Sequence, residues 1–261
     1  MGAINRVTFI GSGRVTYFLI EALKRKEKLP EKVYLYDPDD NAVQKVIQID
    51  DTKIERVDSF QPQIDANIVF LAVHPPIIEK VSRIIVGKLD NIDAVVSFAP
   101  SVSIKRLKSY LSGFYRIVRM IPNAPSLIGE GYNPVAFSDG FDVRLKNEIL
   151  EFFANWGKCP EVREENLEAY AIVSGMGPTY FWFQLLKLKE LAIKFGLSET
   201  EAEDTLISMI KGSVDILFKS SLSTEEVLSL IPVHPLKRFE GSINSFYEER
   251  LREIYDKISI K

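Results

Sequence analysis

The feature that most constrains the fold of this chain is a glycine-rich turn between a short apolar run and an amphipathic stretch. The apolar run Val7–Ile10 leads directly into Gly11–Gly13, and residues 15–26 follow with helical periodicity. The first glycine permits the tight turn, and the second lets an anionic ligand approach the free N–H groups of a helix N-terminus. The sequence therefore predicts a strand–turn–helix unit that binds the pyrophosphate of a dinucleotide.

Two further positions bear on that prediction. Thr16 stands where a third glycine or alanine is usual, and we expect it to move the helix outward without removing an N–H that binds phosphate. Asp37 ends the next apolar run, at about the twenty-residue spacing expected of the acid that binds the adenosine ribose. The alternative is an ordinary strand-to-helix turn without a ligand.

The acidic stretch Asp37–Asp40 also predicts which dinucleotide binds. A carboxylate accepts hydrogen bonds from both ribose hydroxyls of NAD, whereas the 2′-phosphate of NADP meets like charge there, so NAD is favoured over NADP. Arg14 is a candidate ligand for an adenosine phosphate, and the alternative is a solvent-exposed arginine. The motif thus assigns six residues to the cofactor: Gly11, Ser12, Gly13, Arg14, Val15 and Asp37.

Strand-like and helix-like segments alternate through the first part of the chain. After Val7–Ile10 and Val33–Tyr36, further strands are expected at Ile68–Val73, Ala94–Phe98, Tyr115–Val118 and Asn133–Phe137. Such alternation predicts a mainly parallel, doubly wound sheet of the Rossmann type. From about Glu164 onward only helical periodicity remains. We therefore expect a dinucleotide-binding domain over residues 1–163 and an all-helical domain over residues 164–261.

The helical part contains an unusually apolar segment. Ten of the fifteen residues of Phe181–Phe195 are apolar, a stripe wider than one face of a helix. A helix of this kind is buried on several sides, either in a bundle or against another subunit. Ser198–Glu201 and Ser223–Glu226 have the spacing of capping boxes and mark two further helix starts. We expect this domain to mediate dimerisation.

Composition excludes several functional classes. A formal net charge of -3 gives no footprint for nucleic acid or for an anionic membrane. The single cysteine indicates a reducing compartment, the apolar runs are too short to span a bilayer, and no leader precedes the first strand. We expect a cytoplasmic protein. One cysteine and two distant histidines do not form a metal-ligand set, so no metal is expected.

Three further motifs resemble those of pyrroline-5-carboxylate reductases. Phe70–Pro75 is similar to the LAVKP sequence of that family, and Ser174–Tyr180 is similar to SGSGPAY. Val118–Pro125, followed by Gly129–Gly131, resembles VRxMPNTP…GEG. The resemblance implies a Rossmann domain, a helical domain that forms a homodimer or higher homo-oligomer, and reduction by NAD(P)H of the C=N bond of a cyclic imino acid, which yields proline.

The resemblance also assigns site residues. It implies cofactor contacts at Ala72, Val73, His74, Pro75 and Asn123, and substrate contacts at Asn123, Ser174, Gly175, Met176 and Gly177. Free N–H groups at a helix start beside Gly175 and Gly177 suit a substrate carboxylate. The alternatives are that Asn123 caps its own turn and that the two glycines serve close helix packing.

The sequence departs from the family where the substrate is expected to lie. The family's SPGGTT loop corresponds to Ile231–Gly241, which has neither Gly-Gly nor Thr-Thr. The lysine of LAVKP is His74 here, and the middle serine of SGSGP is Met176. Because the glycine turn and Asp37 keep the cofactor end, these changes predict an altered substrate.

The same region supplies candidates for catalysis. His234 and His74 are the only histidines, and histidine titrates near neutral pH, so either is a candidate proton donor; the alternative is two incidental surface residues. Arg238 is a candidate clamp for a substrate carboxylate. We expect a small-molecule substrate and neither nucleic acid nor membrane as a partner. Two alternatives to a pyrroline-5-carboxylate reductase stay open: a related reductase of another imine or keto acid, and a non-catalytic nucleotide-binding regulatory dimer.

Overall fold

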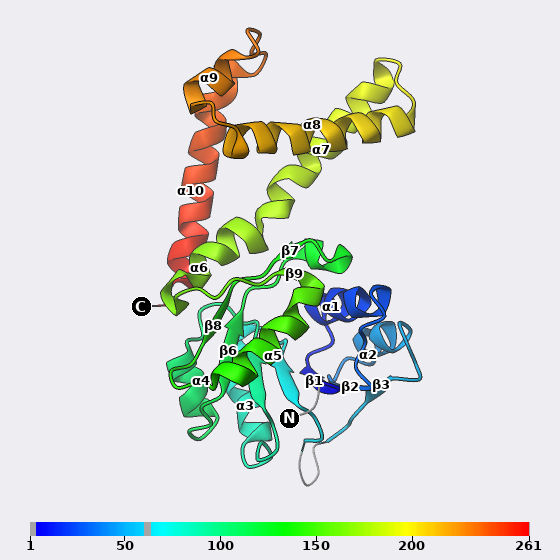
Figure 1. Cartoon of the computed structure of the whole chain (residues 1–261), viewed down its shortest axis with the longest axis vertical. Coiled ribbons are helices and arrows are strands. Elements are labelled where there is room, and N and C mark those ends of the chain that lie inside the picture. Colours follow the sequence, from blue (N-terminus) through cyan, green and yellow to red (C-terminus); the bar gives the residue numbers. More distant parts are fainter. Residues whose placement is uncertain (1–3, 60–63, 261) are drawn as a thin grey trace. The chain divides into compact units, whose positions relative to one another are not determined.

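The computed structural model describes residues 4–59 and 64–260. The chain forms two compact units, the first comprising Met1–Met176 with Ile254–Lys261 and the second Gly177–Glu253. By packing, residues 164–176 therefore belong with the sheet. The two units divide after Met176. The boundary after residue 163 between a dinucleotide-binding and a helical domain stays a prediction about function. Figure 1 labels the elements of both units.

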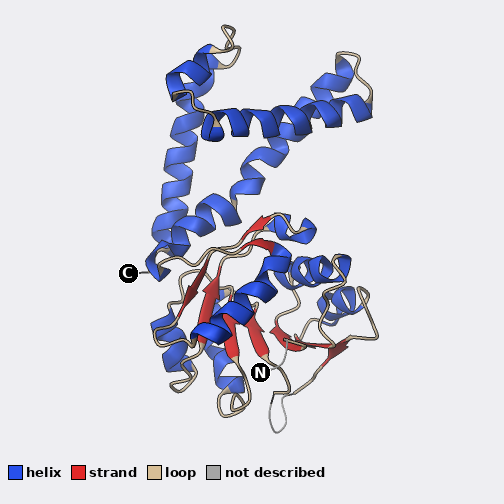
Figure 2. Ribbon diagram, viewed as in Figure 1, coloured by secondary structure: helices blue, strands red, loops and turns tan. Residues whose placement is uncertain are grey.

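The first unit is built on a seven-stranded sheet with the order β3-β2-β1-β4-β5-β6-β8 (Figures 1 and 2). All neighbouring strands are parallel except β6 and β8, which are antiparallel. The strands are β1 Arg6–Ile10, β2 Lys32–Tyr36, β3 Ile54–Arg56, β4 Ile68–Leu71, β5 Ala94–Ser97, β6 Ile117–Met120 and β8 Val135–Phe137. The predicted Rossmann-type doubly wound sheet is confirmed.

Helices cover both faces of this sheet. Buried side chains of α1, α2 and α5 pack in the core on one face, and those of α3 and α4 pack on the other. Neighbouring strand residues alternate between the two cores, as a pleated strand requires; Phe9 belongs to the first and Ile10 to the second. The helices are α1 Arg14–Arg25, α2 Asp40–Ile47, α3 Ile78–Ile85, α4 Ile104–Tyr110 and α5 Val143–Phe153.

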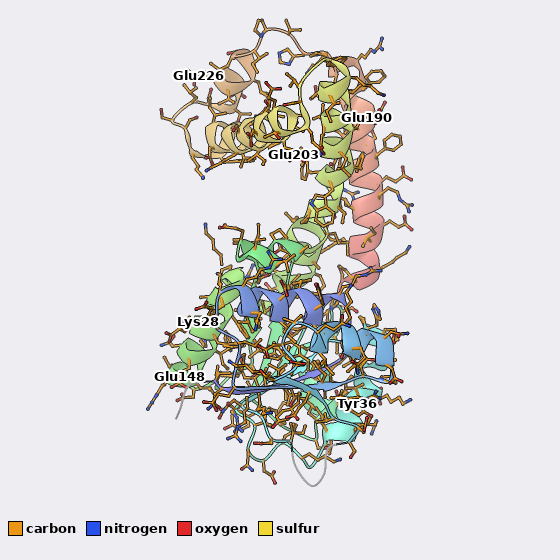
Figure 3. The ribbon with its side chains drawn as sticks, turned by 90° about the vertical axis from the view of Figure 1, so that its right-hand side faces the viewer. Lys28, Tyr36, Glu148, Glu190, Glu203 and Glu226 are labelled. Carbon is orange, nitrogen blue, oxygen red and sulfur yellow. The ribbon has the colours of Figure 1, made fainter. Side chains whose placement is uncertain are left out.

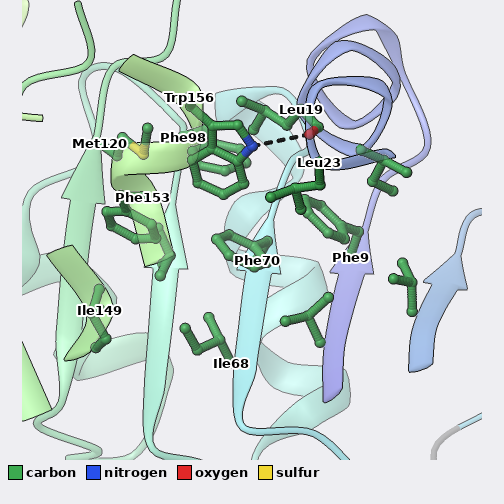
Figure 4. Close-up of a cluster of buried hydrophobic side chains, with 14 of the residues drawn as sticks. Phe9, Leu19, Leu23, Ile68, Phe70, Phe98, Met120, Ile149, Phe153 and Trp156 are labelled. Atoms are coloured by element: carbon green, nitrogen blue, oxygen red, sulfur yellow. Dashed lines mark hydrogen bonds between the residues drawn. The ribbon is translucent and has the colours of Figure 1, made fainter. Parts of the chain in front are cut away.

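An aromatic cluster fixes α1 to the sheet (Figure 4). Phe9 and Phe70 stack with ring centroids 4.4 Å apart, and Trp156 lies edge-on to Phe70 at 5.9 Å. The indole N–H of Trp156 donates to the carbonyl of Leu19 in α1 at 2.9 Å, so this buried polar group is satisfied. The helix that follows the glycine turn is thereby held from its middle.

Three short strands and one irregular helix were not expected from the sequence. Besides β3, the strands β7 Gly131–Tyr132 and β9 Gly157–Lys158 form a separate parallel pair. Their backbones approach so closely that a Cβ on Gly157 would lie 2.3 Å from the carbonyl oxygen of Gly131. Near the end of the first unit, the short helix α6 Leu167–Tyr170 continues into a π-helical segment, Ala171–Gly175.

The second unit is helical, as predicted, and it leaves most of its apolar side chains exposed. Both predicted capping boxes are present, Ser198 with Glu201 and Ser223 with Glu226. On the surface Lys189 pairs with Glu199 and with Glu203, which Figure 3 labels. Large apolar side chains are between 50% and 82% exposed at several positions of α7 and α8 and the turn between them: Phe181, Trp182, Phe183, Leu186, Phe195, Ile207 and Phe218. The helices are α7 Gly177–Lys194, α8 Glu199–Lys219, α9 Thr224–Ser229 and α10 Glu240–Ile258.

Candidate functional site

The glycine turn lies where the strand order changes direction. β1 pairs with β2 on one side and with β4 on the other. The carboxyl end of β1, where the glycine turn begins, is therefore the switch point of the sheet. Gly11 has a φ of +106°, and a Cβ on it would lie 2.5 Å from the carbonyl oxygen of Ala72. Only glycine fits, because both the backbone conformation and the neighbouring backbone exclude a side chain.

Gly13 differs from Gly11, because the protein itself does not require a glycine there. It precedes α1 with a φ of -73°, and a Cβ on it would meet no atom of the described residues within 4 Å. The side-chain oxygen of Ser12, 3% exposed as a residue, has no hydrogen-bond partner among the described residues. Open space at Gly13, a free hydroxyl at Ser12 and the N-terminus of α1 together fit an anionic ligand.

Thr16 is fully buried in the first turn of α1. Its hydroxyl donates to the carbonyl oxygen of Gly11 at 2.6 Å. The hydroxyl of the threonine is therefore satisfied by the turn that it follows. The chain accommodates this departure from the usual glycine or alanine with a hydrogen bond.

Asp37 joins the end of β2 to the glycine turn. One carboxylate oxygen accepts the backbone N–H of Ser12 at 2.6 Å, and the other accepts that of Asp39 at 2.9 Å. Asp39 in turn caps the N-terminus of α2. Arg56, the basic residue at the end of the neighbouring strand β3, pairs with Asp40 and Asp58. The carboxylate of Asp37 is thus held in place at the position where an adenosine ribose is expected.

The segment after β4 runs along the same edge of the sheet. The N–H of Ala72 donates to the carbonyl of Ile10 at 2.8 Å, so this segment is tied to the end of β1. Ala72 and Val73 are half-buried, and His74 is exposed immediately before the 3-10 turn Pro75–Ile77. The structure therefore brings Ala72 and Val73, two of the predicted cofactor residues, beside the glycine turn.

Asn123 connects two of the predicted motifs. Its side chain is buried; the carbonyl oxygen accepts the N–H of Tyr132 at 3.1 Å, and the amide donates to the carbonyl of Ser174 at 3.2 Å. The alternative in which this side chain caps its own turn is wrong, because the 3-10 turn Ala124–Ile128 that follows has no side-chain cap. Asn123 instead holds the loop after β6 against the π-helical segment.

The π-helical segment carries two of the predicted substrate residues, Ser174 and Gly175, and a third, Met176, follows it directly. The hydroxyl of Ser174 donates to the carbonyl oxygen of Tyr170 at 2.9 Å. The N–H of Met176 donates to the carbonyl oxygen of Ala171 at 3.0 Å. A Cβ on Gly175 would lie 3.3 Å from the side chain of Ile121, which follows β6, and a Cβ on Gly177 would meet no atom within 4 Å among the described residues, so neither glycine makes the close helix–helix contact that was the alternative. Irregular helical turns of this kind are frequent at functional sites.

The remaining predicted residues belong to the second unit. Gly177 begins α7 there, and His234 and Arg238 are exposed in the segment between α9 and α10. The guanidinium of Arg238 lies over the ring of Phe239, 4.5 Å from its centroid. The roles of Gly177, His234 and Arg238 at the site stay predictions, because these residues lie in the second unit.

Two buried polar clusters could not be read from the sequence. In the first, the side chain of Asn133 accepts from the N–H of Asn123 and the hydroxyl of Ser126 and donates to the carbonyl of Trp156. In the second, Arg119 of β6 pairs with Glu164 and Glu168, which lie 45 and 49 residues further along the chain. The only signal in the sequence was the motif Val118–Pro125, which contains Arg119, and this motif does not indicate which residues pair with it.

The described residues offer neither a membrane span nor a metal-ion site. Over 4–59 and 64–260, the chain has no helix with the length and apolar character needed to cross a membrane. Within the same ranges, histidine, cysteine, aspartate and glutamate side chains do not gather in groups of three or more that could hold a metal ion. The cysteine, Cys159, is half-buried, and burial raises the pKa of its thiol to about 11.

Comparison with known proteins agrees with this geometry. Residues 6–101 match the family described as NADP oxidoreductase, coenzyme F420-dependent. Over 224 residues the chain is 25% identical to the pyrroline-5-carboxylate reductase of Corynebacterium melassecola, covering 85% of this chain and 83% of that protein. Over most of its length this chain is similar to a pyrroline-5-carboxylate reductase. The resemblance expected from the three motifs is confirmed.

Other relatives extend the comparison. The enzyme of the same name from Staphylococcus epidermidis is 26% identical over 163 residues, which span 62% of this chain and 60% of that protein. The crystal structure of the Plasmodium falciparum pyrroline carboxylate reductase with NADP bound has the same fold, with a TM-score of 0.83 at 22% identity over 99% of this chain and 98% of that one. The Streptococcus pyogenes enzyme gives a TM-score of 0.77 at 17% identity, over 97% and 98%.

Proposed function

We propose that this chain is an oxidoreductase that uses a nicotinamide dinucleotide to reduce the C=N bond of a cyclic imino acid, as its pyrroline-5-carboxylate reductase relatives are named for doing. One observation carries the proposal. The first unit brings the glycine turn, the segment after β4 and the Asn123–Ser174 contact to the same edge of one sheet. Ligands of doubly wound sheets bind at this edge.

Six residues of the first unit are proposed to hold the dinucleotide: Gly11, Ser12, Gly13, Arg14, Val15 and Asp37. The open space at Gly13 and the free hydroxyl of Ser12 support binding of the pyrophosphate there. Asp37 supports NAD over NADP, because its carboxylate is fixed by two backbone N–H groups and would meet a 2′-phosphate with like charge.

The bound nicotinamide would supply a hydride, and the protein must orient the imine and provide a proton. Asn123, Ser174, Gly175, Met176 and Gly177 are proposed to shape the substrate pocket and to orient the imine in it. His74 or His234 is proposed to deliver the proton. If His234 has this role, His234→Ala lowers kcat and leaves NADH affinity unchanged; an equal kcat returns His234 to an incidental surface residue.

A second candidate function is the reduction of a different substrate. The segment 231–241 lacks the Gly-Gly and Thr-Thr of the family loop, and Met176 replaces a serine. These changes favour a related imine or keto acid as the alternative to pyrroline-5-carboxylate. Arg238 supports a substrate that carries a carboxylate.

We also propose that the second unit mediates a homodimer or higher homo-oligomer. Within residues 177–253, the described residues classed as buried are only Gly177 and Ala202, while rings such as Phe183 and Phe218 are exposed. A helical unit of this size without a core of its own needs a partner surface. A cytoplasmic location, also expected from the sequence, stays a prediction.

The test is to mix the purified chain with NADH and pyrroline-5-carboxylate and to follow nicotinamide absorbance. Steady oxidation supports the proposal. Oxidation only with another cyclic imine or a keto acid favours the second candidate. Tight NADH binding without turnover of any cyclic imine or keto acid favours a non-catalytic regulatory dimer. A chain that binds neither NADH nor NADPH contradicts both reductase functions and the regulatory dimer.

A further inference from the structure

A buried ion cluster connects segments of the first unit that are distant in the sequence. Arg119 on β6 is fully buried, and its guanidinium contacts the carboxylate of Glu168 at 2.5 Å and that of Glu164 at 3.1 Å. Glu168 is itself only 2% exposed. Burying charged groups is unfavourable even when they are paired, so a cluster of this kind is retained where it fixes other segments.

Glu168 has a second partner, the backbone of Ser101. The oxygen that contacts Arg119 also accepts the N–H of Ser101 at 3.0 Å. Ser101 has a φ of +62°, in the left-handed region that side chains disfavour. It lies in the turn between β5 and α4, at the carboxyl edge of the sheet. Such a strained conformation persists only where its surroundings hold it, and Glu168 supplies that contact.

The same helix leads directly into the candidate site. Glu168 lies in α6, which continues into the π-helical segment Ala171–Gly175. The carbonyl of Ser174 in that segment accepts the side-chain amide of Asn123, from the loop after β6. The α6 helix therefore links the turn after β5 to the loop after β6, two neighbouring parts of the edge where the substrate is proposed to bind.

We propose that Glu168 is a positioning residue for the reaction: fixed by Arg119, it holds Ser101 in its left-handed conformation and keeps the turn after β5 in register with the π-helical segment. It acts through the backbone of these segments and contacts neither substrate nor cofactor. This inference rests on the proposed reductase function for its kinetic test. Its structural part stands on the Glu168–Ser101 hydrogen bond alone.

Two substitutions at Ser101 test the turn without disturbing the ion cluster. Ser101→Gly removes the strain, since glycine adopts a positive φ without steric cost, and we expect wild-type kcat and KM. Ser101→Val places a β-branched side chain in the same conformation, and we expect kcat to fall about tenfold or more while NADH affinity is unchanged. Wild-type kcat in Ser101→Val overturns the proposal.

Rescue tests the role of the carboxylate. Glu168→Leu, which removes the acceptor for the Ser101 N–H, is expected to lower kcat about tenfold at a temperature where the variant is folded, and Ser101→Gly added to it is expected to restore most of kcat. The melting temperature is not expected to recover, because the charge beside Arg119 is still missing. Loss of kcat that Ser101→Gly does not rescue indicates a merely structural ion pair and overturns the inference.

A measurement without substrate separates this inference from the proposed function. Hydrogen exchange of the Ser101 amide is expected to be slow in the wild-type chain and much faster in Glu168→Leu, which has no acceptor for this N–H. If the chain proves inactive on every imine and keto acid but this difference is found, the proposed function fails and the positioning contact stands. If the Ser101 amide exchanges equally fast in both, the contact itself is contradicted.

Discussion

The carboxylate of Asp37 accepts the backbone N–H of Ser12 at 2.6 Å. This contact joins the end of β2 to the glycine turn, so one side chain both shapes the turn and presents negative charge to the ribose. Its other oxygen is held by the N–H of Asp39. The carboxylate therefore cannot turn away from a 2′-phosphate without losing hydrogen bonds at both oxygens.

Replacing that charge is expected to change the choice of cofactor. Asp37→Asn keeps an acceptor for one of the two N–H groups but removes the like-charge repulsion. We expect the ratio of the KM for NADPH to that for NADH to fall by about tenfold, equivalent to about 1.4 kcal/mol. Asp58→Asn removes a surface carboxylate near Arg56 and serves as the control. An Asp37→Asn ratio equal to that of the control contradicts the preference for NAD.

The two glycines of the turn are expected to fail differently when replaced by alanine. At Gly11 the new Cβ would lie 2.5 Å from the carbonyl oxygen of Ala72, at a positive φ, so Gly11→Ala should lower both the melting temperature and NADH affinity. At Gly13 a Cβ meets nothing within 4 Å among the described residues, so Gly13→Ala should keep the melting temperature and lose NADH affinity. Calorimetry of unfolding and of binding separates the two effects. Unchanged NADH affinity in Gly13→Ala contradicts the assignment of this turn to the pyrophosphate.

The apolar surface of the second unit is expected to be covered by another copy of the chain. Phe183 and Phe218 are 66% and 76% exposed in a unit without a core of its own. Light scattering should give at least twice the mass of one chain, and Phe183→Glu should reduce the mass or make the melting temperature depend on protein concentration. Val143→Glu, at a position 70% exposed in the first unit, is the matched control. A monomeric wild-type chain with a cooperative, concentration-independent unfolding transition contradicts this prediction.

Cys159 is expected to be unreactive in the native chain. Burial raises the pKa of its thiol from 9.0 to about 11, so the reactive thiolate is scarce near neutral pH. Since the folded chain holds this proton more tightly than the unfolded chain, the associated stability is present at neutral pH and lost as pH rises toward 11. Thiol labelling at neutral pH should be slow in the native chain and fast in urea. Equal labelling rates in the native chain and in urea contradict the expectation that burial makes the Cys159 thiol unreactive.

Much of the first unit follows from the order of residues along the chain. Continuous apolar runs indicate strands that are covered on both faces, and the glycine turn with Asp37 indicates the switch point before any coordinates are known. Capping boxes likewise fix the starts of α8 and α9, because they are local hydrogen-bond patterns. These features depend on neighbours in the sequence, which is why they are predictable.

The parts that escaped prediction depend on contacts between distant residues. The grouping of residues 164–176 with the sheet follows from Arg119, whose glutamate partners lie 45 and 49 positions away. The β7–β9 pair depends on the close approach of Gly131 to Gly157. Asn123 was expected at the cofactor and the substrate, with a cap on its own turn as the alternative, and the bonds of its side chain to Tyr132 and Ser174 were not foreseen. No local pattern encodes these contacts.

Transfer of the hydride to the substrate tests the central claim most directly. NADH deuterated at the transferred position of its nicotinamide is incubated with the chain and pyrroline-5-carboxylate, and the product is analysed by mass spectrometry. The proposed function predicts proline that carries the deuterium on the carbon of the former C=N bond, and much less of it with Gly13→Ala. Proline without the label, or no product from a chain that binds NADH tightly, would contradict the account.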